Sequence, residues 1–153
     1  MTLAPPRWFE DVTVGETLPP LETTITLTSL VMYAGATWDF HRFHYDLAFV
    51  AALGMPAPFM DGQMVGALLA RQLMQWGGAD AFVRRLNFRL REIVYAGDRI
   101  VLNGVVSGTT TESGRSLALC TLDVMKTDGR DVVRDATAAV ELRRRQPDLA
   151  VKI

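Results

Sequence analysis

The 153-residue chain has little of what many small domains use for covalent or metal-based stability. It contains one cysteine and two histidines. A single cysteine excludes a disulfide within the chain and any site built from several cysteines. Because 49% of the residues are hydrophobic, the chain can bury a core without such cross-links. We therefore expect a single domain, over residues 1–153, that is held together by packing.

The chain also lacks an excess of charge and a long apolar run. Its formal net charge is −1 at pH 7, whereas a nucleic-acid-binding domain needs a clear basic excess. The longest apolar candidate, residues 47–70, is interrupted by prolines and by Asp61, so it is no membrane span. The first residues, MTLAPPRWFED, do not resemble a secretory signal. These absences predict a cytoplasmic protein that binds neither nucleic acid nor a membrane.

One long helix dominates the predicted elements. Residues 63–76 are apolar on most sides of the helix, and the polar residues Arg71, Gln72 and Gln75 form a narrow stripe. Such a helix must be buried on most sides. The elements predicted before it are a strand over residues 21–27, a short helix over 30–36 capped by Thr28 or Ser29, a loop over 37–46, and a short helix over 47–53 capped by Asp46.

The composition after the helix is typical of β-strands. Four β-rich segments follow, over residues 83–94, 99–107, 116–126 and 131–142. Short glycine-containing connections, at residues 96–98, 112–114 and 128–129, predict that consecutive strands are antiparallel neighbours. A long antiparallel meander and one apolar helix predict an α+β fold in which the sheet wraps around the central helix.

Both histidines fall in one short window, DFHRFHYD, at residues 39–46. A carboxylate and an imidazole together can handle a water molecule, because one takes a proton while the other gives one. A second interpretation is structural, with Asp39 closing a turn while the histidines fill space. A third is a metal site built from His41, His44 and Asp46, although the chain has no further histidine to complete it.

A longer segment around this window, residues 33–66, reads YAGATWDFHRFHYDLAFVAALGMPAPFMDGQMVG. It resembles the signature of the MaoC-like, R-specific enoyl-CoA hydratases. A weaker match to the same family is IVYAGDRI at residues 93–100. The resemblance covers nearly the whole chain and implies a hotdog fold, in which an antiparallel sheet wraps around one long central helix. The residues at matching positions of the signature are Tyr33, Ala34, Asp39, His44, Asp46, Gly54, Pro58 and Gly62.

The resemblance implies roles for three residues. Asp39 and His44 match the family's catalytic dyad, which holds and activates a water that adds syn across a 2-enoyl thioester, or leaves in the reverse reaction. Gly62 matches the glycine whose backbone N–H binds the thioester oxygen. The amides at the start of a helix stabilise a developing enolate charge, which agrees with that role. The other interpretation of Gly62 is a simple turn residue.

The chain departs from the family pattern beside these residues. His41 and Arg42 replace an Asn-Pro pair, and Asp61 replaces the histidine that usually precedes the glycine. The departures leave the dyad in place and make His41, Asp61 and Gln63 candidates for substrate contacts. For His41 a structural role, such as a polar anchor of the loop, is the favoured explanation. Candidates for binding CoA phosphates, for each of which ordinary surface charge is the stronger explanation, are Arg42, Arg84, Arg85 and Arg89.

The resemblance implies an enzyme that hydrates 2-enoyl-CoA or dehydrates 3-hydroxyacyl-CoA thioesters, without a metal or cofactor, as a homodimer or a larger assembly of dimers. The variant Asp-Phe-x-x-x-His-x-Asp, here residues 39–46, also resembles one subunit of the MaoC-like hydratases that act on steroid side-chain CoA esters. The first alternative is therefore a subunit of a heteromeric hydratase with a second hotdog protein, or a non-catalytic acyl-binding partner. A hotdog thioesterase is less favoured, because thioesterases typically lack this loop pattern.

Overall fold

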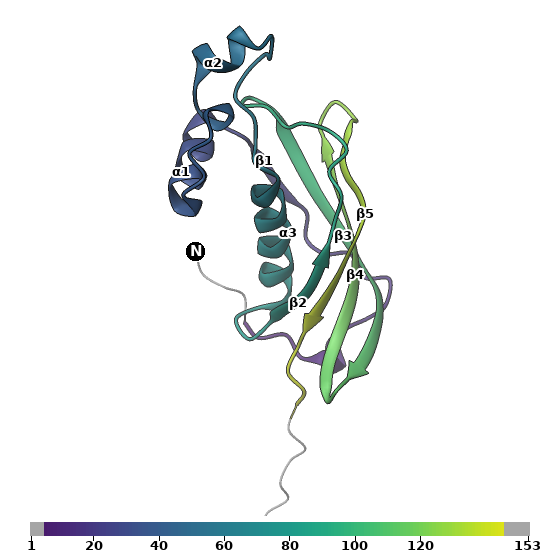
Figure 1. The fold of residues 1–153 in the computed structure, drawn as a ribbon. Helices are drawn as coiled ribbons and strands as arrows, with labels where there is room; N and C mark the ends of the chain where they lie inside the picture. The colour runs from purple at the N-terminus through teal and green to yellow at the C-terminus, as the bar shows by residue number, and fades with distance from the viewer. Residues whose placement is uncertain (1–4, 146–153) are drawn as a thin grey trace, which may run out of the picture.

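The computed structural model describes residues 5–145, which contain five strands in one curved antiparallel sheet (Figure 1). Neighbouring strands follow the order β1-β3-β4-β5-β2, and every pair is antiparallel. The hairpins that join β3 to β4 and β4 to β5 confirm the prediction from two of the glycine-containing connections. The strands are β1 (Leu21–Thr24), β2 (Phe82–Asn87), β3 (Arg99–Glu112), β4 (Arg115–Lys126) and β5 (Asp131–Glu141).

Helix α3 (Gly62–Gly77) packs against the sheet and forms the centre of the core (Figure 1). Leu69 and Leu73 of this helix are both 0% exposed, and they belong to one cluster with buried residues from β3, β4 and β5. The sheet curves around the helix because the helix is apolar on most sides. The predicted helix over residues 63–76 and the predicted α+β architecture are therefore confirmed.

Helix α1 (Leu27–Thr37) begins earlier than the sequence predicts. The Thr26 hydroxyl accepts the Ser29 N–H, and the Ser29 hydroxyl accepts the Thr26 N–H, both at 3.0 Å. This reciprocal capping box satisfies two amide groups at once. The cap is therefore Thr26 rather than Thr28 or Ser29, and the preceding strand ends at Thr24 instead of at residue 27.

Helix α2 (Leu47–Ala52) begins after its predicted cap. The Asp46 carboxylate accepts the Phe49 N–H at 2.9 Å. Figure 1 shows α1 beside α3, on the side that faces away from the sheet, and α2 beyond the start of α3. No helix within residues 5–145 is long and apolar enough to cross a membrane.

The predicted strand over residues 83–94 is wrong in its second half. β2 ends at Asn87, and the chain then leaves the sheet. The Arg91 N–H donates to the Val132 carbonyl at 2.9 Å, which keeps the segment beside β5. Leu90 instead faces the start of α3, because its Cδ1 lies 2.8 Å from where a Cβ on Gly62 would be. The backbone of Leu90 still forms one isolated antiparallel bridge with Val133 of β5, while its side chain covers the start of the helix.

The connection at residues 96–98 does not join neighbouring strands. β2 pairs with β5 at one edge of the sheet, whereas β3 pairs with β1 and β4. The prediction that the strands on either side of this connection are neighbours is therefore wrong. Residues 88–98 carry the chain past the start of α3 instead. β3 also continues to Glu112, beyond its predicted end at residue 107, and a bulge lies between Val106 and Gly108.

We predict that Leu73→Ala lowers the free energy of unfolding by about 2–5 kcal/mol, because it leaves a cavity between α3 and the sheet. Urea denaturation followed by circular dichroism measures this loss. The matched control is Arg71→Ala on the exposed side of the same helix, which should change stability by no more than about 0.5 kcal/mol. Equal losses in the two variants would contradict the central position of Leu73.

Candidate active site

The window that holds both histidines follows α1 and contains one short turn. Trp38 ends α1 in the left-handed conformation, with a φ of 59°, and the 3-10 turn η2 spans Arg42–His44. Between them, Oδ1 of Asp39 accepts the His41 N–H at 3.2 Å. These reversals bring Asp39 and His44 to the wall of one small cavity, which they share with residues of α1 and α3.

His44 is held in one orientation by the backbone of Phe59. Its side chain is buried, and Nδ1 lies 2.8 Å from the Phe59 carbonyl oxygen. A carbonyl oxygen only accepts hydrogen bonds, so Nδ1 carries a proton, and neutral His44 has its lone pair on Nε2. Nε2 lies 3.9 Å from Oδ2 of Asp39. Both atoms are then acceptors, and the distance between them is longer than that of a direct hydrogen bond.

Asp61 adds a second carboxylate to the same region. Its Oδ1 accepts the Gln63 N–H at 3.0 Å as the N-cap of α3, whereas its buried Oδ2 has no hydrogen-bond partner within residues 5–145. Asp61 lines the small cavity together with Tyr33, Asp39 and His44. Burial, together with the nearby Asp61 charge, raises the pKa of Tyr33 above its usual value. The site therefore combines two carboxylates with an imidazole.

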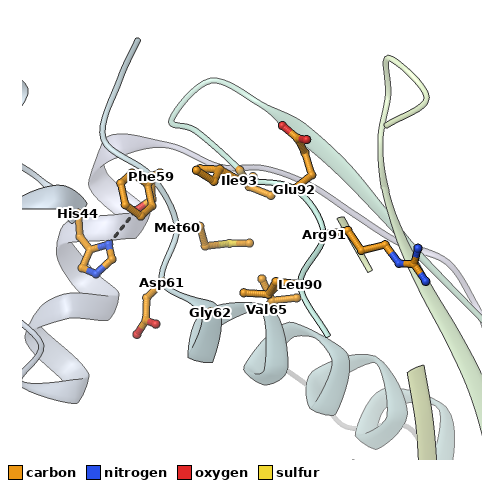
Figure 2. Close-up of a pocket in the computed structure, with 11 residues that line it drawn as sticks. His44, Phe59, Met60, Asp61, Gly62, Val65, Leu90, Arg91, Glu92 and Ile93 are labelled. Atoms are coloured by element: carbon orange, nitrogen blue, oxygen red, sulfur yellow. Dashed lines mark hydrogen bonds between the residues drawn. The ribbon is translucent and has the colours of Figure 1, made fainter. Parts of the chain in front are cut away.

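A larger cavity of about 370 Å³ opens beside His44 (Figure 2). This volume is in the range of small-molecule sites. Its polar end is formed by His44, Asp61 and the backbone of Gly62 at the start of α3, whose first amides have no partner inside a helix. Figure 2 shows the charged ends of Arg91 and Glu92 pointing away from the cavity centre. The rest of the wall is largely apolar and is lined by Phe59, Met60, Val65, Leu90, Ile93 and Val94.

The comparisons with known proteins agree with this geometry. A family model described as "MaoC like domain" matches residues 11–127. The chain belongs to the MaoC-like family. A curated relative, the beta subunit of the 3-oxo-4,17-pregnadiene-20-carboxyl-CoA hydratase of Mycobacterium tuberculosis, is 32% identical over 133 residues. The match covers 86% of this chain and 96% of the relative.

Two solved structures have the same fold. A chain of the ChsH1–ChsH2 complex from Mycobacterium tuberculosis matches with a TM-score of 0.76 at 28% identity, over 86% of this chain and 98% of that one. The (R)-hydratase of A. caviae involved in PHA biosynthesis matches with a TM-score of 0.76 at 21% identity, over 87% of this chain and 98% of that one. The predicted hotdog fold is confirmed.

The substrate contacts predicted beside the MaoC-like motif divide into two groups. Asp61 lines the cavity with His44, as described above. His41 lies outside both cavities, where its Nδ1 accepts the Phe43 N–H at 3.3 Å and its ring stacks on Phe43. Gln63 is exposed and lines neither cavity. Sequence reasoning missed Phe59, because a backbone carbonyl that holds a histidine leaves no residue-type signal.

The candidate phosphate-binding arginines also differ. Three of them are paired with carboxylates: Arg42 with Asp46, Arg84 with Glu141 and Arg85 with Glu112. Arg89 forms no ion pair within residues 5–145. It lines a surface cavity of about 410 Å³ with Leu90 and Arg91, and these two residues also line the larger cavity beside His44. Among the four, Arg89 is the one whose guanidinium is available to a ligand.

The alternative metal site is not assembled in the described part of the chain. Within residues 5–145, no group of three or more His, Cys, Asp or Glu side chains lies close enough to hold a metal ion. The Asp46 carboxylate accepts the Phe49 N–H and pairs with Arg42 at 2.9 Å. These contacts hold the pKa of Asp46 below its ordinary value, and they assign this carboxylate to the capping of α2.

We predict that Asp61→Ala lowers the free energy of unfolding by about 1 kcal/mol, because α3 loses its N-cap acceptor. The matched variant Asp61→Asn keeps an oxygen that can accept the Gln63 N–H and should lose less. Chemical denaturation of the two variants measures the difference. An equal loss in both would show that the cap does not account for the role of Asp61 in stability.

Proposed function

We propose that the chain is a subunit of a heteromeric enoyl-CoA hydratase and carries the catalytic Asp39–His44 pair. The observation that supports this most directly is the lone pair on Nε2 of His44 facing Oδ2 of Asp39 at 3.9 Å, beside a largely apolar cavity. The similarity to the beta subunit of a CoA-ester hydratase supports the heteromeric alternative rather than a homodimer that acts alone. By analogy with that relative, the substrate is a bulky 2-enoyl-CoA.

The proposed reaction uses the gap between the two acceptors. A water between them donates one hydrogen to Oδ2 of Asp39 and the other to Nε2 of His44, so its oxygen lone pair is free to attack C3 of the enoyl group. His44 takes a proton as the C3–O bond forms. The electrons move to the thioester oxygen, where the Gly62 amide at the start of α3 stabilises the enolate. Protonation of C2 from the dyad completes the addition.

The glycine at position 62 suits this role sterically. A Cβ there would lie 2.8 Å from Cδ1 of Leu90, closer than two carbon atoms approach without one of them moving. With hydrogen at this position, Leu90 covers the start of α3, and Gly62 lines the cavity. The arrangement thus allows a thioester oxygen to approach the helix N-terminus closely.

The assay that tests the proposed function follows two products separately. The purified chain is incubated with crotonyl-CoA and with a steroidal 2-enoyl-CoA, alone and with each other MaoC-like protein of its source organism. Loss of enoyl absorbance reports hydration, and reaction with a thiol reagent reports hydrolysis. Burial raises the pKa of Cys120 to about 12, so the protein's own thiol adds no background.

The outcome of this assay distinguishes a heteromeric hydratase, a homodimeric hydratase and a thioesterase. Hydration only in the presence of a second protein supports the heteromeric hydratase. Hydration by the chain alone would show that no second protein is required and would favour a homodimer that acts by itself. Thiol release without hydration would overturn the proposal in favour of a thioesterase.

We predict that Asp39→Asn and His44→Ala each lower kcat at least about 100-fold, because each removes one of the acceptors that hold and activate the water. Steady-state hydration in the active assembly measures this, with Arg71→Ala as the control. Circular dichroism confirms that the variants fold. Near-normal activity in either dyad variant would assign catalysis to the partner and make this chain the non-catalytic subunit.

The residues around the dyad take supporting roles in the proposal. The buried Oδ2 of Asp61 has no hydrogen-bond partner within residues 5–145, so it is an acceptor for a polar hydrogen of the substrate. Arg89, beside Arg91 on the adjoining surface cavity, binds a CoA phosphate. His41 and Gln63 lie outside the cavity beside His44, and any contact they make with substrate is to its exposed portion.

We predict that Arg89→Gln raises KM for an enoyl-CoA about tenfold with little change in kcat, because a charge-assisted hydrogen bond to phosphate is lost. The corresponding pantetheine thioester, which lacks the phosphates, should show no such rise. The control is Arg84→Gln, since Arg84 is paired with Glu141. An equal rise in KM for both thioesters would exclude a phosphate contact.

A further inference from the structure

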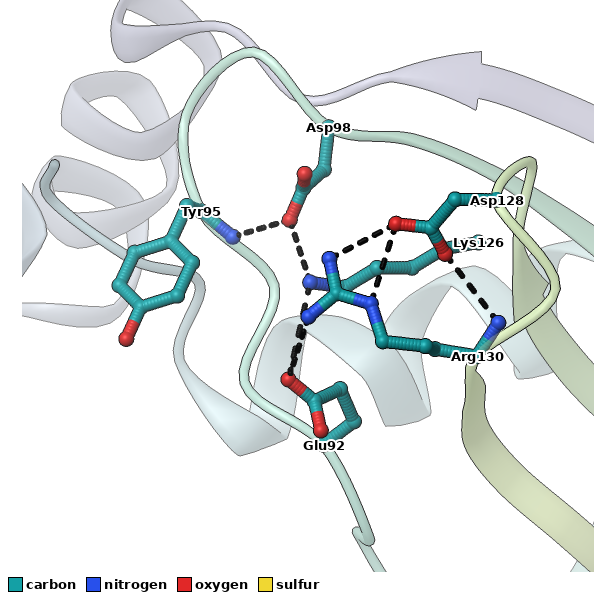
Figure 3. A network of polar contacts seen from close by, with 6 residues as sticks. All are labelled: Glu92, Tyr95, Asp98, Lys126, Asp128 and Arg130. Carbon is teal, nitrogen blue, oxygen red and sulfur yellow. Dashed lines mark hydrogen bonds and ion pairs between the residues drawn. The ribbon is translucent and has the colours of Figure 1, made fainter. Parts of the chain in front are cut away.

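Lys126, the last residue of β4, carries a buried charge within a network of polar side chains beside Tyr95 (Figure 3). Its side chain is only 2% exposed, and Nζ lies 2.7 Å from Oδ2 of Asp98 and 3.9 Å from Oε1 of Glu92. A buried ammonium group is stable only when it is paired. Lys126 therefore ties the end of β4 to the segment that follows the cavity wall.

The carboxylate that pairs with Lys126 also closes a tight turn. Oδ2 of Asp98 accepts the Tyr95 N–H at 2.8 Å, and the Asp98 N–H donates back to the Tyr95 carbonyl at 3.0 Å. Nζ of Lys126 also lies 5.6 Å from the centroid of the Tyr95 ring. The lysine thus holds Tyr95 by its backbone, through Asp98, and by its aromatic ring.

Tyr95 in turn lies against the strand-like segment that carries Phe59. The two residues form an antiparallel bridge, and their rings meet edge to face with centroids 6.2 Å apart. On either side, the Met60 N–H donates to the Val94 carbonyl and the Ala96 N–H donates to the Pro58 carbonyl, both at 2.8 Å. The Phe59 backbone therefore lies between two supports: the Tyr95 turn on one side and η2 on the other, where the Phe59 N–H donates to the Phe43 carbonyl at 3.1 Å.

The carbonyl of Phe59 is the group that holds His44. Nδ1 of His44 donates to it at 2.8 Å. A continuous series of contacts therefore runs from Lys126 through Asp98 and Tyr95 to this carbonyl, although Lys126 lines neither cavity beside His44.

We propose that Lys126 is a positioning residue for His44: through Asp98, Tyr95 and Phe59 it keeps the imidazole proton on Nδ1 and the lone pair on Nε2. The inference rests on the proposed function where it concerns catalysis. The tautomer of His44 can nevertheless be observed without any substrate. The positioning role of Lys126 and the proposed hydratase activity can therefore be tested independently.

A purely stabilising ion pair has different consequences. Its loss lowers the melting temperature and leaves the tautomer of His44 unchanged in the protein that is still folded. A positioning role requires the tautomer itself to change, because the hydrogen bond made by one ring nitrogen decides which nitrogen carries the proton. The state of the ring therefore separates the two roles.

The test is ¹⁵N NMR of protein labelled at histidine, at a pH where the imidazoles are neutral. The chain has two histidines, and the His44 signals are assigned by their loss in His44→Gln. In the wild type we expect separate shifts for a protonated Nδ1 and an unprotonated Nε2. In Lys126→Met the two His44 shifts should move toward each other, because the ring then exchanges between tautomers.

His41 provides an internal control in the same spectra. Its Nδ1 accepts the Phe43 N–H, so its neutral ring carries the proton on Nε2, opposite to His44. Its shifts should not respond to Lys126→Met. The matched control variant is Arg130→Met, since Arg130 belongs to the same polar network but contacts Glu92 and Asp128 instead of Asp98. This variant should leave both histidines unchanged.

The kinetic consequence is measured in the active assembly. We expect Lys126→Met to lower kcat about tenfold or more while KM changes less than about twofold, since Lys126 does not line the cavity and a small misplacement of the base slows the chemical step. Lys126→Arg, which keeps the charge, should recover part of kcat and of the His44 shift separation. Unchanged His44 shifts in folded Lys126→Met would overturn the proposal.

A second variant keeps the proposal testable if Lys126→Met does not fold. Asp98→Asn retains an oxygen for the Tyr95 N–H and removes only the charge that faces Lys126. The same convergence of the His44 shifts is expected, and its absence in the folded variant also overturns the positioning role. A chain that shows the shift changes but hydrates no enoyl-CoA would leave the positioning role standing and overturn the proposed function.

Discussion

The burial of one apolar helix determines most of this structure. Because α3 is apolar on most sides, it cannot lie on the surface, and the sheet must curve to cover it. A helix enclosed in this way has its first turn at the end of the core, where no strand covers it. The first amides of a helix have no partner within the helix, so the start of α3 becomes a polar point in apolar surroundings. The cavity lies against this point, with Asp61 and Gly62 at its polar end.

The walls of that cavity come from two segments that cross the start of α3 and belong to no helix or strand. One leads into α3 and carries Phe59, and the other, residues 88–98, connects β2 to β3. They are joined by short stretches of backbone pairing, and the second is tied to β4 by the buried charge of Lys126. Loops positioned by rigid elements commonly carry function. Here the rigidity comes from the pairing of two loops, from one buried ion pair and from a short contact of residues 90–91 with β5.

The sequence predicts the elements whose signal is local and misses those that depend on tertiary contacts. The long helix was predicted over residues 63–76 and spans Gly62–Gly77, because its apolar pattern and its glycine end lie within the helix itself. The two hairpins follow from short glycine turns in the same way. Residues 88–94 have a strand-like composition, but apolar side chains among them pack against the start of α3, so the segment does not continue β2. The proximity of Asp39 and His44 was predicted from their shared window, whereas the carbonyl of Phe59 was not, since every residue has a carbonyl.

The choice of partner for Nδ1 of His44 bears on the direction of the proposed chemistry. A carboxylate at Nδ1 would also fix the protonated nitrogen, but it would place a further negative charge against the ring. The neutral carbonyl of Phe59 fixes the same tautomer without adding a charge at that nitrogen. Neither nearby carboxylate binds this nitrogen: Oδ2 of Asp39 lies 3.9 Å from Nε2, and Asp61 lines the small cavity with a buried Oδ2 that has no partner within residues 5–145. In the proposed mechanism Nε2 takes a proton from the water, and the dyad returns a proton to C2 of the substrate. Hydration and dehydration can then proceed through one arrangement of the site, as a reversible addition of water requires.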